Sequence, residues 1–151
     1  FEFLFSSGCR ITETLMMNRE DVNLKERTAR VKGKGKKIRT VHFSNRCAIL
    51  LEKYLSTLPE ESQAIFLNHR GHRMTRQGAH KILKGIGKKV KLKGTLGPHR
   101  LRHSFATTLL SKGAGLDFIA EELGHNQLST TRVYARLPKE EIVTMYRKYM
   151  G

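Results

Sequence analysis

Residues 28–44, TARVKGKGKKIRTVHFS, place the tightest limit on how this chain can fold. Apolar and polar residues alternate at both ends of the stretch, and the alternation is interrupted by Gly33-Lys34-Gly35. A period of two on each side of a glycine-containing turn is typical of a β-hairpin. We therefore predict two antiparallel strands with Lys34 at their tip. The apolar positions of these strands are Val31, Ile38, Val41 and Phe43.

The rest of the chain is predicted to be mostly helical, because its apolar residues recur at spacings of three and four. Residues 64–74 are the exception and are predicted to form a short strand and a turn. Pro98 and Thr75 suit helix starts, and Gly113 suits a helix end. The predicted helices are 1–5, 10–17, 45–58, 76–90, 98–112, 116–123, 129–137 and 139–150. The fold class is therefore mainly α with one small antiparallel sheet (α+β).

Three of these helices have apolar faces that the spacing assigns to the core. In the helix at 45–58 the inward residues are predicted to be Ile49, Leu50, Tyr54 and Leu58. In the helix at 76–90 they are predicted to be Ile82, Leu83, Ile86 and Val90. In the helix at 98–112 they are predicted to be Leu101, Phe105 and Leu109.

The charge of the chain points to a polyanionic partner. The sequence carries 29 Lys and Arg against 13 Asp and Glu, a formal net charge of +16. No acidic residue lies between Ser62 and Leu116 or between Arg27 and Leu51, and basic residues fill both spans. A surface that only served solubility would intersperse the two signs. We therefore expect one face that binds phosphates, with nucleic acid favoured over a membrane surface.

Length and cysteine content fit one globular domain in a reducing compartment. The chain has 151 residues, and 38% of them are hydrophobic, which is enough for a sizeable core. Cys9 and Cys47 lack the spacing of a zinc ribbon or a disulfide framework. No run of about 18 apolar residues is present, so neither a membrane span nor a membrane partner is predicted. We expect a cytoplasmic protein. The opening FEFLFSSGCR begins inside an apolar segment, so we expect a piece of a longer protein.

Four separate motifs hold polar residues that could act in a chemical reaction, and each has an ordinary structural explanation as well. His99 and Arg102 share a helix face in PHRLRH but also fit a solvated basic turn. Arg10 could pair with Glu13, and Lys34 could guard a strand edge. The last motif holds His125 and Tyr134, residue types that more often fill half-buried structural sites.

Taken together, these residues suit the cleavage of a phosphodiester. Arginine forks match the non-bridging oxygens of the phosphate and stay charged, so they can supply the positive charge that a metal ion supplies elsewhere. Histidines can donate hydrogen bonds to the same group or accept a proton. A tyrosine can attack covalently, and a lysine can protonate the leaving oxygen. The paired carboxylates of a two-metal nuclease are not apparent.

With these residues in this order, the sequence resembles the catalytic domain of the tyrosine recombinases, the phage-integrase and Xer-type family. The resemblance covers nearly the whole chain and rests on motifs that occur in the family's order. These motifs are SGCRITE, VKGKGKKIRTVHFS, HRLRHSFATTLL, LGH and LSTTRVYARL. The family's catalytic pattern of Arg, Lys, His-x-x-Arg, His and Tyr falls on Arg10, Lys34, His99, Arg102, His125 and Tyr134.

The resemblance also implies a role for each of these residues. Arg10 and Arg102 would clamp the scissile phosphate, with His99 and His125 assisting. Tyr134 would attack and form a 3′-phosphotyrosyl link, and Lys34 would be the general acid for the 5′-hydroxyl. Resealing would then need no ATP, and neither a cofactor nor a metal is implied. Glu13 falls where the family carries an acidic residue that orients the first arginine.

The resemblance further implies a site-specific recombinase that acts on double-stranded DNA and self-associates there, as a tetramer of the full-length protein. Residues 1–151 would be the catalytic domain, without the core-binding domain that precedes it in the family. Two alternatives stay open: a type IB topoisomerase, which uses the same chemistry, and a basic DNA-binding module without catalysis. The apolar stripe of residues 142–150 predicts a terminal helix that packs either on its own chain or on a neighbouring protomer.

Overall fold

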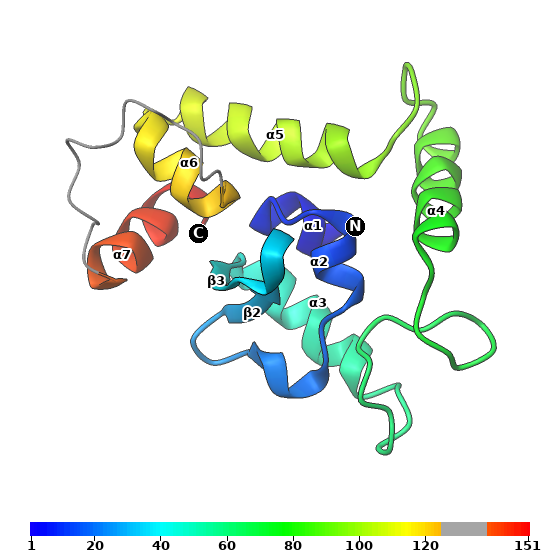
Figure 1. Ribbon diagram of the computed structural model, residues 1–151. Helices are drawn as coiled ribbons and strands as arrows, with labels where there is room; N and C mark the ends of the chain where they lie inside the picture. Colours follow the sequence, from blue (N-terminus) through cyan, green and yellow to red (C-terminus); the bar gives the residue numbers. More distant parts are fainter. Residues whose placement is uncertain (125–138) are drawn as a thin grey trace.

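The computed structural model describes residues 1–124 and 139–151 and has the predicted fold class, mainly α with one small antiparallel sheet. The first half of the chain contains the sheet, and the second half is helical (Figure 1). The described helices are α1 (Glu2–Ser7), α2 (Ile11–Leu15), α3 (Asn45–Leu55), α4 (Arg76–Lys89), α5 (Pro98–Ser111), α6 (Leu116–Leu123) and α7 (Lys139–Met150). The strands are β1 (Val22–Asn23), β2 (Thr28–Lys32) and β3 (Ile38–His42), and short 3₁₀ turns lie at Arg19–Asp21 and Lys34–Lys36.

The hairpin prediction is confirmed, and its register explains which residues face inward. β2 and β3 pair antiparallel from Thr28↔His42 to Lys32↔Ile38, and β1 adds a two-residue edge that the sequence pattern did not reveal. Gly35 sits in the tip with a φ of 75°, a conformation that glycine adopts without strain. Of the apolar strand positions, Val31, Val41 and Phe43 are buried, whereas Ile38 is 61% exposed.

Three packed clusters hold the molecule together, and α1 lies between them in the middle of the ribbon (Figure 1). Phe3 of α1 joins the cluster formed by the sheet and α3, whereas Leu4 joins the cluster formed by α2, α4 and the start of α5. The third cluster joins the end of α5 to α6 and α7. A six-residue helix therefore fixes the sheet relative to the long helix α5.

The predicted inward face of α5 is confirmed, since Leu101, Phe105 and Leu109 are buried. The predicted inward face of α3 is right for Tyr54 and wrong for Ile49 and Leu50. Ile49 and Leu50 are 47% and 45% exposed, because α3 packs through Cys47, Leu51 and Tyr54, and Leu58 lies beyond the helix end. The apolar residues of this helix form two adjacent stripes, and the spacing alone does not decide which stripe meets the sheet.

The helix α4 corrects the prediction in a similar way. Thr75 caps it as predicted, accepting a hydrogen bond from the backbone N–H of Gly78. Ile82 and Val90 are exposed, however, and Leu83 packs inward together with Ala79. Gly87 lets α4 approach Leu96 closely, because a Cβ on Gly87 would lie only 2.8 Å from Leu96 Cβ.

The segment 64–74 forms isolated bridges rather than the predicted strand. Ala64 pairs with Asn18, and Leu67 pairs with Arg73 around the predicted turn. No helix among residues 1–124 and 139–151 is long and apolar enough to cross a membrane. The predicted helix at 129–137 lies outside the described residues.

The terminal helix α7 packs on its own chain, one of the two arrangements that its apolar stripe allows. Tyr146 is buried, and Ile142, Met145, Tyr149 and Met150 pack around the same cluster.

Candidate active site

A buried carboxylate, Glu13, lies at the centre of the candidate site. Glu13 stands in the first turn of α2, and its Oε2 accepts a hydrogen bond from the backbone N–H of Arg10 at 2.9 Å. Its Oε1 accepts from Arg10 Nη1 at 3.3 Å. The glutamate thus caps the start of its own helix and holds the arginine side chain three residues earlier. The predicted pairing of Arg10 with Glu13 is confirmed.

Arg102 reaches the same region from α5, whose apolar face is anchored in the core. Its Nη1 donates to the backbone carbonyl of Gly8 at 2.5 Å, and its Nη2 donates to the carbonyl of Leu123 at 2.7 Å. Gly8, between α1 and α2, has a φ of 64°, and a Cβ there would lie 2.4 Å from a Phe105 ring carbon. These two bonds leave the remaining guanidinium N–H groups available for an external acceptor.

The electrostatics of the site favour an anion. Burial, together with the charges of Arg10 and Arg39, lowers the pKa of Arg102 to about 10. The group stays protonated at neutral pH. Arg10 and Arg39 both pair with Glu13, and the charges of all three residues act on Arg102. An anion placed here relieves the mutual repulsion of the arginines, and bidentate arginine contacts suit phosphate oxygens.

Arg39 is the site residue that the sequence analysis missed. It lies on β3, and its Nη2 donates to Glu13 Oε2 at 3.0 Å. Its Nη1 donates to the backbone carbonyl of Glu122 at 2.7 Å. A signal for it existed, because Arg39 shares strand parity with Val41 and Phe43, which are both buried. A charged residue in an inward strand position needs a buried partner.

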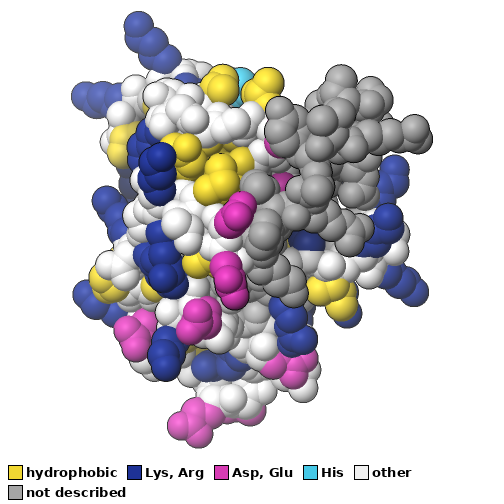
Figure 2. Space-filling view, turned by 90° about the vertical axis from the view of Figure 1, so that its left-hand side faces the viewer, with side chains coloured by type: hydrophobic (Ala, Val, Ile, Leu, Met, Phe, Trp, Pro, Cys, Tyr) yellow, Lys and Arg dark blue, Asp and Glu magenta, His cyan; other side chains and the backbone are white. Residues whose placement is uncertain are grey.

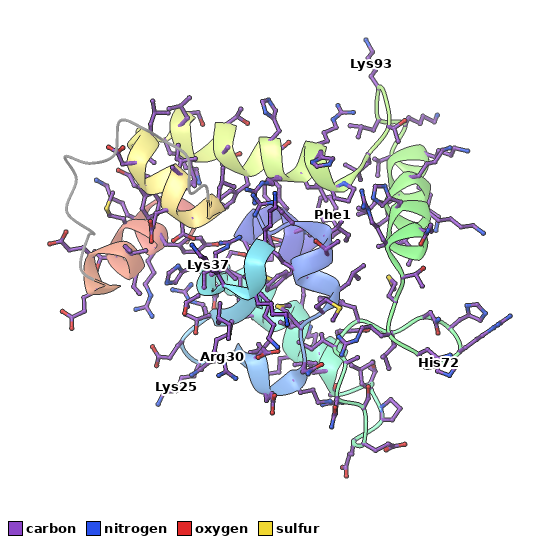
Figure 3. All side chains as sticks on the ribbon, in the orientation of Figure 1. Phe1, Lys25, Arg30, Lys37, His72 and Lys93 are labelled. Atoms are coloured by element: carbon purple, nitrogen blue, oxygen red, sulfur yellow. The ribbon has the colours of Figure 1, made fainter. Side chains whose placement is uncertain are left out.

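Lys34 lies where the hairpin prediction put it, exposed on the 3₁₀ turn Lys34–Lys36. The preceding residue brings this turn to the arginines, since a Cβ on Gly33 would lie 3.3 Å from Glu13 Oε1. In Figure 3 the labelled Lys37, at the other end of the turn, lies in the middle of the view near β3. The hairpin tip therefore starts beside the carboxylate that holds Arg10.

His99 stands exposed in the first turn of α5, one helical turn before Arg102. The structure therefore gathers Arg10 and Arg102 around Glu13, starts the Lys34 turn beside them, and places His99 on the helix that carries Arg102. His125 and Tyr134 lie outside the described residues. The first described part of the chain ends at Gly124. This glycine packs against the site, because a Cβ there would lie 2.5 Å from Arg39 Nε.

The other three tyrosines each donate a hydrogen bond to a backbone carbonyl. Tyr54 donates to the carbonyl of Ile65 at 2.9 Å, and Tyr149 donates to that of Gly113 at 3.4 Å. Tyr146 donates to the carbonyl of Ser6 at 2.5 Å, and burial raises the pKa of its hydroxyl. Each of these hydroxyls is engaged with backbone.

Several basic residues of the acid-free span between Ser62 and Leu116 extend outward from the body of the molecule. Exposed lysines and an arginine line α4, and Lys93 projects from the loop after it (Figure 3). On the face nearest α7, Asp and Glu side chains lie along the middle and lower part, with Lys and Arg side chains beside and between them as well as at the margins (Figure 2). The exposed basic residues of α4 are Arg76, Lys81, Lys84, Lys88 and Lys89.

Comparison with known proteins gives a consistent picture. A model of the phage integrase family matches residues 1–141. The tyrosine recombinase XerD of Staphylococcus epidermidis is 42% identical over 154 residues, and that of Oceanobacillus iheyensis is 39% identical over 155 residues. Each alignment covers 98% of this chain and 52% of the relative. The chain thus spans about half the length of the curated relatives it matches.

Solved structures share the fold. A crystal structure of XerA recombinase superposes with a TM-score of 0.79 at 30% identity, covering 99% of this chain and 56% of that chain. A structure of XerH site-specific recombinase bound to difH substrate, a pre-cleavage complex, gives a TM-score of 0.71 at 32% identity. That match covers 93% of this chain and 42% of XerH.

Proposed function

The chain belongs to the phage integrase family, and on this premise we propose that it is the catalytic domain of a tyrosine-type site-specific recombinase. The enzyme cleaves and rejoins strands of double-stranded DNA. The observation that carries the proposal is the cluster of Arg10, Arg39 and Arg102 around the single carboxylate of Glu13. The cluster holds more positive charge than its own carboxylate neutralises, as a phosphate site requires.

Arg10 and Arg102 bind the scissile phosphate and stabilise the charge that builds on its non-bridging oxygens. Arg102 is held by the carbonyls of Gly8 and Leu123, so its fork is oriented before DNA arrives. Arg10 is held by Glu13 while its side chain stays 43% exposed. Fixed donors at the reacting phosphate lower the activation barrier because they need no reorganisation during the reaction.

Tyr134 is the nucleophile of the proposed reaction. Its oxygen forms a bond to phosphorus, the bond from phosphorus to the 5′-oxygen breaks, and Lys34 gives a proton to that oxygen. The phenolic proton passes to a histidine, His99 or His125, or to a phosphate oxygen. The product is a 3′-phosphotyrosyl link and a free 5′-hydroxyl. Attack of a 5′-hydroxyl on this link reverses the steps and reseals the strand without ATP.

Duplex DNA is the proposed substrate, and self-association on it, as a tetramer of the full-length protein, is the proposed assembly. XerH was captured on its difH substrate. The exposed basic helix α4 adds positive charge beyond the arginine cluster. Each phosphate contact lowers the logarithm of the binding constant by about 0.9 per tenfold rise in salt. We expect steep salt dependence and weak sequence selectivity for this domain alone. A flat salt dependence would count against a phosphate-binding face.

The proposed place of action is the cytoplasm, and the candidate biological roles are phage integration, transposon movement and chromosome-dimer resolution. Cys9 and Cys47 are both buried free thiols, which fits a reducing compartment. Burial raises the pKa of Cys9 to about 12 and that of Cys47 to about 11, so neither is a ready nucleophile at neutral pH.

A nicked suicide duplex that carries the cognate site tests the proposal with the full-length protein. Wild type should form a covalent adduct that survives denaturation, and Tyr134→Phe should bind the DNA and form none. A supercoil-relaxation assay beside a two-site recombination assay separates a recombinase from a topoisomerase. Absence of any adduct with wild type would leave only a basic DNA-binding module and overturn the proposal.

A further inference from the structure

We propose that Arg39 is a positioning residue of the cleavage reaction, which orients Glu13 and the end of α6 so that the phosphate-binding arginines are set before DNA binds. The inference rests on the proposed function. The side chain of Arg39 is only 20% exposed, so little of its guanidinium group can contact a ligand at the surface. Its low exposure, together with internal hydrogen bonds from both terminal nitrogens, leads us to infer that Arg39 acts through other residues and not on the phosphate.

The first of its contacts controls Glu13. One carboxylate oxygen, Oε2, accepts from both Arg39 Nη2 and the backbone N–H of Arg10, at 3.0 and 2.9 Å. The other oxygen, Oε1, is then left to face Arg10 Nη1 at 3.3 Å. Without Arg39, the carboxylate could rotate or turn both oxygens to Arg10. The orientation of the exposed Arg10 fork therefore depends on Arg39 through Glu13.

The second contact controls the end of α6. Arg39 Nη1 holds the carbonyl of Glu122, and Arg102 Nη2 holds the next carbonyl, that of Leu123. Arg39 of β3 and Arg102 of α5 thus donate hydrogen bonds to consecutive carbonyls at the C-terminus of α6. Gly124 follows with a φ of 64° and no side chain, which leaves room for Arg39 Nε at this point. Arg39 therefore links the hairpin that carries Lys34 to the helix end that precedes His125.

The buried Nε of Arg39 has no hydrogen-bond partner among residues 1–124 and 139–151. Burying a charged group with an unsatisfied donor is costly. An apolar residue would fill a merely structural role at lower cost, since the neighbouring inward positions are Val41 of β3 and Phe43, the residue directly after β3. The two terminal contacts explain why an arginine stands there. A lysine has one nitrogen and cannot hold the two acceptors with the planar fork of arginine.

The test measures three properties of the full-length protein in Arg39→Lys and Arg39→Met: the unfolding midpoint, the affinity for the cognate duplex, and the single-turnover rate of adduct formation at saturating DNA. The matched control is Arg19→Lys. Arg19 is also held by backbone carbonyls, those of Ser62, Leu58 and Pro59, and none of these hydrogen bonds involves Glu13 or α6. The rate is measured well below every unfolding midpoint, so that loss of folded protein does not lower it.

We expect Arg39→Lys to slow adduct formation by about tenfold to a hundredfold, the size of effect that misplaced reacting groups produce. DNA affinity should change by less than about threefold, because the surface charge is unchanged. Arg19→Lys should lower the unfolding midpoint and leave the rate intact. The effects of Arg39→Lys and Glu13→Gln should also be non-additive in the double variant, because both act on the same carboxylate contact.

The outcomes separate this inference from the proposed function. If wild type forms no Tyr134-dependent adduct, the proposed function fails and the inference falls with it. If wild type forms the adduct and Arg39→Lys matches its rate within about twofold, only the inference fails. Failure of both Arg39 variants to fold, or a rate loss equal to that of Arg19→Lys, would assign Arg39 a purely structural role and overturn the proposal.

Discussion

Two buried glutamates, Glu13 and Glu122, sit in one small protein and have opposite surroundings. Each side chain is about 2% exposed. Glu13 faces the guanidinium groups of Arg10 and Arg39. Glu122 faces a single imidazole, with Oε1 at 2.9 Å from His42 Nδ1. Its Oε2 has no hydrogen-bond partner among the described residues.

The difference separates a site that receives an anion from one that is closed. Around Glu13 the arginines exceed the carboxylate in charge, and Arg10 remains partly exposed. Around Glu122 the ring of Tyr146 lies 5.4 Å from that of His42, and the tyrosine hydroxyl is bonded to Ser6. In the proposed reaction the first cluster binds the phosphate, whereas the second packs against Tyr146 of α7. Arg39 borders both, through the Glu13 carboxylate and the Glu122 backbone.

The largest expected effect comes from Arg102→Lys in the Glu13 region. Lysine keeps the charge but loses the planar fork of arginine. That fork donates to the carbonyls of Gly8 and Leu123 and, in the proposed reaction, also to the phosphate. Losing one such transition-state contact costs about 3 kcal/mol, or roughly a hundredfold in rate. The measurement is single-turnover adduct formation, with circular dichroism as the check on folding. Near-normal cleavage by a folded variant would remove Arg102 from the site.

Glu122→Gln should affect stability and not the chemical step. The substitution removes the charge from a buried pair and leaves His42 with a weaker acceptor, at a cost of about 2 kcal/mol in unfolding free energy. Urea unfolding measures this loss. The adduct rate of the folded protein should match wild type. If Glu122→Gln lowered the adduct rate without lowering the unfolding free energy, Glu122 would belong to the reacting site, and the two glutamate regions would not differ in role.

Glu13→Gln should show the reverse pattern. The amide keeps the shape but cannot accept charge-assisted bonds from Arg10 and Arg39 with both oxygens. We expect adduct formation to slow by about tenfold or more, while DNA affinity stays close to that of wild type. If Glu13→Gln cleaves at the wild-type rate and is merely less stable, the Glu13 region is as structural as that of Glu122.

The smallest effect is expected from Tyr146→Phe, which removes the hydrogen bond to Ser6 and costs about 1 kcal/mol at neutral pH. The pH dependence should also change. Burial raises the pKa of Tyr146 above its unfolded value near 10, so the folded state holds this proton more tightly. Its stability contribution is full below pH 10 and declines as the pH rises beyond it. Wild type should lose unfolding free energy above pH 10 more steeply than Tyr146→Phe.

The sequence predicted those features of the site that depend on local pattern. The hairpin with Lys34 at its tip, the start of α5 at Pro98 and the Arg10–Glu13 pair all follow from spacing over a few residues. Arg39 was missed because only the packing of β3 against α2 and α6 shows its partners, Glu13 and the Glu122 carbonyl. The sequence did contain one indication: Arg39 falls on the same strand face as the apolar residues Val41 and Phe43, where a charged residue needs a buried partner.

The same limit explains the errors in the core. In α3 the spacing fits two neighbouring faces, and only the contact with the sheet selects Cys47 and Leu51 over Ile49 and Leu50. The buried pair of His42 and Glu122 joins residues 80 positions apart, which no local pattern reveals. Long-range packing decides both cases.

The identity of the tyrosine that carries the DNA tests the central claim most directly. Trypsin separates all four candidates. Tyr134 falls in residues 133–136, Tyr54 in residues 54–70 and Tyr146 in residues 140–147, and Tyr149 follows Lys148 directly. The covalent adduct of the full-length protein with a suicide duplex is digested, and the nucleotide-bearing peptide is identified by mass spectrometry. The account predicts the peptide Val133–Arg136. A nucleotide on the peptide of Tyr146, in the region assigned to anchoring α7, or on either other tyrosine would contradict it.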